Sequence, residues 1–234
     1  MHRSLLRLST FALAAVFTAA ACSQAAPGTS QASPTRAPSA APSATAAASA
    51  ATLTSKSADL RTTLNLQLSE HVYLAGFSVA EALLGNTPGF EGGAAALDQN
   101  SVELGKTIAA AYGPEAEKRF LELWRAHIGM FVAYTQASTK NDAAGKAKAV
   151  ADLDGYRKDF DAFLSGANPN LPKGAVEQLL VMHVNGIAKS VDLLAAKDYK
   201  SGYANLKTAE DHSIMLADPI TAAIVKQFPD KLGN

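Results

Sequence analysis

The sequence repeats with a period of 56 residues, and this repeat constrains the fold more than any other feature. His71, His127 and His183 occupy the same position in three successive units. An apolar residue stands three positions before each histidine, and another stands one position after it. A fixed period of this length is typical of one supersecondary unit used several times. The equal spacing is therefore first of all evidence of duplication, and it predicts three copies of one structural unit.

Each unit is predicted to be an antiparallel pair of helices. In the first unit, apolar side chains recur every three or four residues from Leu64 to Leu83, which is the spacing of an amphipathic helix. A second helix is expected after a break in each unit, because glycine, asparagine, aspartate and proline interrupt helices. These breaks lie at residues 85–89, 141–142 and 197–198.

The end of the chain is predicted to add one short helix. Pro219 suits a first helical turn, Asp218 is placed to cap it, and the helix should end before Phe228. No segment has the pattern of a strand. The predicted fold class is therefore all-α, with three repeated antiparallel helical hairpins that form a helical bundle, plus a short C-terminal helix.

Residues 1–22 have the features of a lipoprotein-type signal peptide. Two arginines precede an apolar run, Phe11 to Ala21, that is too short to span a membrane as a mature helix. Small residues then lead into Cys22, the only cysteine in the chain, at the position where a lipobox cysteine is lipidated. Ordinary cleavage, which would release a secreted protein, is the alternative to this lipidation.

The remainder divides into a tether and a domain. Residues 23–57 consist almost wholly of Ala, Ser, Pro, Thr and Gln, a composition that predicts a disordered tether. Residues 58–234 are long enough for one all-α repeat domain with its own core. We therefore expect an extracytoplasmic protein anchored to the cell membrane by an N-terminal lipid. Acidic and basic residues are balanced and no basic patch carries interleaved aromatic residues, so nucleic acid is not an expected partner.

The repeated histidines are expected to face the interior, because each lies one helical turn from apolar residues on both sides. Residues equally distant from the turn of a hairpin lie opposite each other, so each histidine has a partner position on the second helix. Each histidine therefore either binds a ligand or hydrogen-bonds this partner. The predicted pairs are His71 with Asn100, His127 with Tyr156, and His183 with His212.

Methionines close to the histidines suggest that the ligand bound by the histidines is a metal ion, and which metal it is. Met130 follows His127 by three residues and Met215 follows His212 by three, so each pair shares a helix face. Imidazole and thioether donors without a thiolate suit copper, Cu(I) above all. A metal site is predicted to centre on His183 and His212. The full set of candidate ligands is His183, His212, Met215, His127, Met130 and His71.

Two functions remain open. The first is binding of a transition-metal ion, copper first; the second is a non-enzymatic interaction or structural module of the cell envelope, whose histidines only fasten the hairpins. In a closed bundle the three repeated histidines can converge, whereas in an open solenoid they would stack roughly 10 Å apart. Catalysis is not expected, because the sequence contains no HExxH, GxSxG or phosphate-loop motif and supplies no nucleophile or oxyanion site.

Five segments of the domain resemble a helical module of bacterial secreted proteins. They are LSEHVYLAG from Leu68, ELWRAHIGMFVAY from Glu122, LLVMHVN from Leu179, AEDHSIMLAD from Ala209 and AIVKQFPDK from Ala223. Some of those proteins carry the label "copper amine oxidase N-terminal domain", which refers to a separate β-rich segment with no counterpart in this sequence. The resemblance implies an extracytoplasmic all-α module, and neither amine oxidation nor a topaquinone cofactor.

Overall fold

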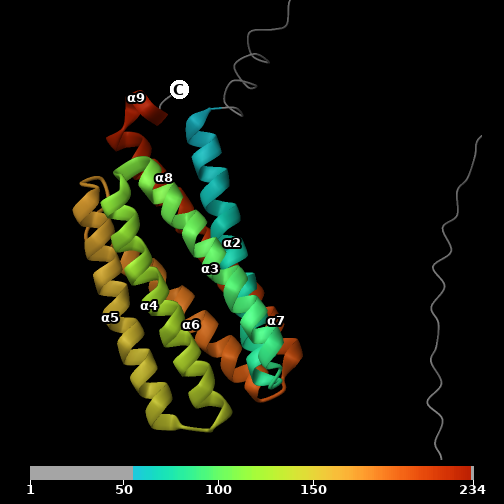
Figure 1. The fold of residues 1–234 in the computed structure, drawn as a ribbon. Helices are drawn as coiled ribbons and strands as arrows, with labels where there is room; N and C mark the ends of the chain where they lie inside the picture. The colour runs from blue at the N-terminus through green and yellow to red at the C-terminus, as the bar shows by residue number, and fades with distance from the viewer. Residues whose placement is uncertain (1–54, 233–234) are drawn as a thin grey trace, which may run out of the picture. The chain divides into compact units, whose positions relative to one another are not determined.

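The computed structural model describes residues 55–232, which form helices joined by short turns, with no strand in this range (Figure 1). The prediction of an all-α fold is confirmed. The expected signal peptide with Cys22, and the tether up to residue 54, lie outside the described residues. The helices are α2 (Lys56–Leu83), α3 (Thr87–Tyr112), α4 (Pro114–Thr139), α5 (Ala143–Ala167), α6 (Ala175–Ala195), α7 (Tyr199–Ile214), α8 (Ala217–Gln227) and α9 (Pro229–Leu232).

The turns inside the three hairpins use equivalent residues of the repeat. Asn86, Asp142 and Asp198 are the N-caps of α3, α5 and α7, and each side chain accepts a hydrogen bond from a backbone N–H three residues further on. The residue before each cap adopts a positive φ, which is 53° at Asn141 and 62° at Lys197. The same local chemistry therefore reverses the chain after α2, α4 and α6.

The C-terminal segment begins earlier than predicted. The expected start at Pro219 and the cap at Asp218 were wrong, because α8 already begins at Ala217 and has no side-chain cap. Asp218 lies in the first turn of α8 and instead pairs with Arg61 of α2, with Nε and Oδ1 2.5 Å apart. The predicted end before Phe228 is confirmed, and α9 follows it.

The hairpins close into a bundle. Each helix contacts the next along the chain from α2 to α7, and α7 and α8 return to α2. The first helices of the hairpins, α2, α4 and α6, run in the same direction and also contact one another (Figure 1). Closure of the bundle therefore brings equivalent faces of the three repeats together.

No helix among residues 55–232 is long and apolar enough to cross a bilayer.

The repeated histidines form a layer between two apolar clusters of the core. One cluster contains Leu68, Trp124 and Leu180, which stand three positions before the histidines. The next contains Val72 and Val184, which stand one position after two of them. The three imidazoles consequently lie at one height in the bundle, with apolar side chains above and below.

A buried aspartate sets the start of α6. The connection 168–174 is the longest between helices in the described chain. Asp161 of α5 accepts hydrogen bonds from the backbone N–H groups of Gly174, Val176 and Glu177, at 2.8, 3.0 and 3.2 Å. A carboxylate at this position satisfies N–H groups that a helix start leaves free and complements the helix dipole. It therefore helps to hold α6, and the third repeated histidine, at its height.

Candidate metal centre

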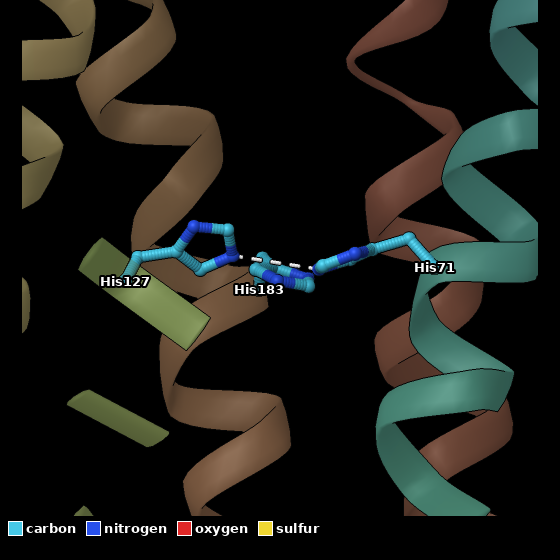
Figure 2. A group of neighbouring side chains, drawn as sticks. All are labelled: His71, His127 and His183. Atoms are coloured by element: carbon cyan, nitrogen blue, oxygen red, sulfur yellow. Dashed lines mark hydrogen bonds between the residues drawn. The ribbon is translucent and has the colours of Figure 1, made fainter. Parts of the chain in front are cut away.

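His71 of α2, His127 of α4 and His183 of α6 converge on one point inside the bundle (Figure 2). One ring nitrogen from each lies within 4.8 Å of the other two. The Nε2 atoms of His71 and His127 are 3.4 Å apart. All three side chains are buried, with 3%, 2% and 5% of their surface exposed. The prediction that they face the interior is confirmed, and three histidines from separate repeats form one group.

The spacing of these nitrogens suits a metal ion. Two imidazole nitrogens bound at about 2.05 Å to a tetrahedral ion stand about 3.3 Å apart. The Nε2 atoms of His71 and His127 have almost this separation, at 3.4 Å. One nitrogen from each of the three rings lies within 4.8 Å of the chosen nitrogens of the other two, so side-chain shifts of up to about 1.5 Å would bring the third imidazole to the same distance. The three histidines can therefore hold a metal ion.

The imidazoles are uncharged at neutral pH. Burial lowers the pKa of His71 to about 3 and that of His183 to about 4, and it holds the pKa of His127 well below the ordinary value. Repulsion between the neighbouring rings adds to this effect, while the backbone of Trp124 opposes it at His127. A metal ligand must be the neutral imidazole, so the site needs no deprotonation before it binds an ion.

Within the described structure His71 and His127 do not hydrogen-bond their predicted partners Asn100 and Tyr156, although their Nε2 atoms hydrogen-bond each other between α2 and α4. Asn100 donates to the Gln67 carbonyl and the Glu70 carboxylate, both at 2.9 Å, and not to His71. The ring of Tyr156 stacks on His127 with centroids 4.7 Å apart, and its buried hydroxyl has no partner. The Nδ1 atoms of His71, His183 and His212 are likewise buried without a partner. Each such atom costs about 1–3 kcal/mol, so the hydrogen bond between His71 and His127 leaves part of the polarity of the cluster unsatisfied.

The other predicted ligands lie outside this group. His212 of α7 is close enough to His183 to disfavour its protonation, but it is not part of the group. Met215 follows α7 and is half exposed, while Met130 packs against apolar side chains of the core. The structure therefore gathers the three repeated histidines rather than His183, His212 and Met215.

Carboxylates do not join the cluster either. The group of potential ligands within the described residues consists of histidines alone. The acids that recur two positions before the partner residues are engaged elsewhere, so the imidazole layer carries no negative charge. Asp98 pairs with Arg125, Asp154 pairs with Arg157, and Glu210 accepts a hydrogen bond from Ser69.

Aromatic rings surround the histidines and hold them in place. The ring of Trp124 lies 4.7 Å from those of His71 and His127, measured between centroids. Phe131 meets His183 edge-on at 6.4 Å. The sequence pattern identified Trp124 as apolar but not as a neighbour of two histidines. Its position one helical turn before His127 was the only feature of the sequence that pointed to this contact.

An elongated pocket leads from the surface to the three imidazoles. Its volume is about 250 Å³, and side chains of α2, α3, α4 and α6 line it. The histidines are the first lining residues on their helices, and the walls continue towards the C-terminal ends of α2 and α4. Gly85, Thr87 and Gln136 also line the pocket and are exposed, which places its mouth near the α2–α3 turn. The sequence pattern gives no sign of this pocket, because its walls come from all three hairpins.

Comparison with known proteins gives no match to a protein family, a curated protein or a solved structure. The fold and the site define residues 55–232 as an all-α bundle with a buried three-histidine group that can hold a metal ion.

Proposed function

We propose that this protein binds a copper ion through His71, His127 and His183 on the extracytoplasmic side of a membrane. The observation that carries the proposal is the convergence of three buried, neutral imidazoles at nearly the spacing of metal ligands. Three helices each contribute one ligand, so the folded bundle presents the site before the ion arrives. Such preorganisation favours tight binding.

The chemistry of the ligands favours copper over harder cations. Imidazole suits copper, zinc, nickel and iron, and copper is the strongest binder among the divalent ions of the series. The group contains no carboxylate that would neutralise a bound ion. A low-dielectric interior penalises each added charge, so a singly charged ion costs less to bury than a doubly charged one. We therefore propose that Cu(I) is the preferred form.

We further propose binding rather than catalysis. Histidines are the only titratable residues among the described side chains that line the pocket. A reaction that needs a carboxylate base or a thiol nucleophile would have no such group there. Storage or transfer of the ion requires only the ligands and a path to the surface.

The ligand set can be tested by X-ray absorption on protein loaded with Cu(I) without oxygen and then desalted. One tightly held copper per chain is expected, with nitrogen scatterers at about 2.0 Å and no sulfur at about 2.3 Å. Parallel loading with zinc tests the choice of metal. A sulfur shell would instead support the methionine-containing site. Absence of retained copper would overturn the proposal and favour an interaction module, for which exposed Leu66, Tyr73 and Phe77 on α2 would be the candidate contacts.

We also propose that lipidation of Cys22 anchors the protein to the membrane. The apolar run before the single cysteine supports this proposal. In a bacterial host that processes lipoproteins, the wild-type chain should incorporate labelled palmitate and sediment with membranes. A Cys22→Ala variant should lose both properties. Equal membrane association of the two chains would argue against the anchor.

A further inference from the structure

The pocket extends well beyond what a metal ion needs. Along α2 its wall runs from His71 to Ala82, a helix length of about 16 Å at 1.5 Å per residue. Its volume of about 250 Å³ exceeds that of an apolar cavity of about 150 Å³ known to accept benzene. A compact molecule with about ten non-hydrogen atoms therefore fits between the mouth and the imidazoles.

The walls of the pocket are apolar and uncharged. Val72, Phe131 and Ile187 line it close to the histidines. The two buried hydroxyls of the wall are already engaged, because Ser78 donates to the carbonyl of Leu74 and Thr135 to that of Phe131. Polar groups that still lack a strong partner are thus concentrated at the imidazole end. This combination favours a molecule with an apolar body and a polar group at one end.

We propose that the pocket binds a small, uncharged, mainly apolar molecule that directs one lone-pair donor atom to the metal held by the three histidines. This inference rests on the proposed copper site. Three protein ligands leave a fourth tetrahedral position free, and in other metalloproteins a small molecule occupies that position. Here the pocket begins at the same histidines, so its axis leads from the mouth to the metal.

A pair of probes can separate the two parts of such a ligand. Imidazole offers the donor nitrogen alone, and 4-phenylimidazole adds an apolar ring of the size that the pocket accepts. Calorimetric titration of Cu(I)-loaded protein without oxygen should show that 4-phenylimidazole binds at least about tenfold more tightly than imidazole, because its phenyl ring leaves water. The copper content of each sample is measured beforehand.

A filled pocket provides the matched control. Ala82 lines the wall eleven residues from His71, about 16 Å along α2, and is remote from the metal. Ala82→Phe should retain copper but reduce the preference for 4-phenylimidazole to less than about threefold. Ala95→Phe places the same ring on an exposed site of α3 and should behave like wild type.

The outcomes distinguish the two proposals. Copper-loaded wild type that binds both probes equally, or Ala82→Phe that keeps the full preference, would overturn the pocket ligand and leave the metal site intact. Wild type that retains no copper would overturn both proposals.

Discussion

Lowering the pH from about 7.5 to about 5 is expected to remove about 6 kcal/mol of the folding stability of the metal-free protein. The pKa of His71 is about 3 and that of His183 about 4 in the folded chain, whereas an unfolded histidine titrates near 6.5. Between these values the unfolded chain binds more protons than the folded one. Stability is therefore constant above about pH 6.5 with respect to these groups, and it falls as the pH decreases towards 4.

The expected loss is large for a domain of this size. Each buried histidine contributes up to about 1.4 kcal/mol per pH unit, so the three together contribute up to about 4 kcal/mol per unit. Total stabilities of domains are only about 5–15 kcal/mol. Urea unfolding at a series of pH values, followed by circular dichroism, measures this slope. The slope gives the number of protons taken up on unfolding. A value below one between about pH 6.5 and about pH 5 would contradict the prediction.

A single substitution provides the control for this experiment. His127→Phe retains an aromatic ring against Trp124 and Tyr156 but cannot take up a proton in the unfolded chain. The metal-free variant should therefore take up about one proton fewer than wild type when it unfolds. Its stability at about pH 5 should exceed that of wild type, because phenylalanine leaves no buried nitrogen unsatisfied.

The same substitution is expected to weaken metal binding by a factor of about a hundred to a thousand. Structural metal sites with four ligands bind with about 10–16 kcal/mol, so one ligand accounts for about 3–4 kcal/mol. His71→Phe and His183→Phe should have comparable effects, because each helix supplies one ligand. Competition with a copper chelator of known affinity measures these losses.

His212 tests which histidines form the site. It is adjacent to His183 but lies outside the converging group, so His212→Phe should change copper affinity by less than about tenfold. Trp124 provides an independent signal, since it is the only tryptophan and its ring lies 4.7 Å from two of the proposed ligands. Its fluorescence should respond to copper in His212→Phe but not in His127→Phe at the same concentration. A larger loss in His212→Phe than in His127→Phe would restore the site centred on His183 and His212.

Local patterns in the sequence were sufficient to predict the hairpins. The apolar spacing around Leu68 and Val72 identified a helix with one buried face, and both residues are in the core. The turn residues at Asn86, Asp142 and Asp198 marked the reversals, because capping depends on neighbours three residues away. The start of α8 was missed, since Asp218 satisfies Arg61 on a distant helix rather than its own N-terminus.

Local patterns could not predict which histidines lie together in the folded chain. Within one hairpin, His183 and His212 were predicted to occupy opposite positions, and this geometry led to a predicted site centred on these two residues of the third repeat. Opposite positions within a hairpin do not depend on how one hairpin packs against another. Contacts among α2, α4 and α6 decide that His71, His127 and His183 meet, and those contacts join residues from different repeats.

The sequence by itself determined that residues 55–232 are all-α and that the three repeated histidines are buried, and it predicted three related hairpins, because these properties follow from periodicity over a few turns of helix. Only the tertiary structure decided that the bundle closes and that the buried histidines form a single group at the end of an apolar pocket. Closure depends on the packing of faces that are far apart in the chain. Three equivalent buried faces suit a closed bundle and an open stack equally well until those contacts are known.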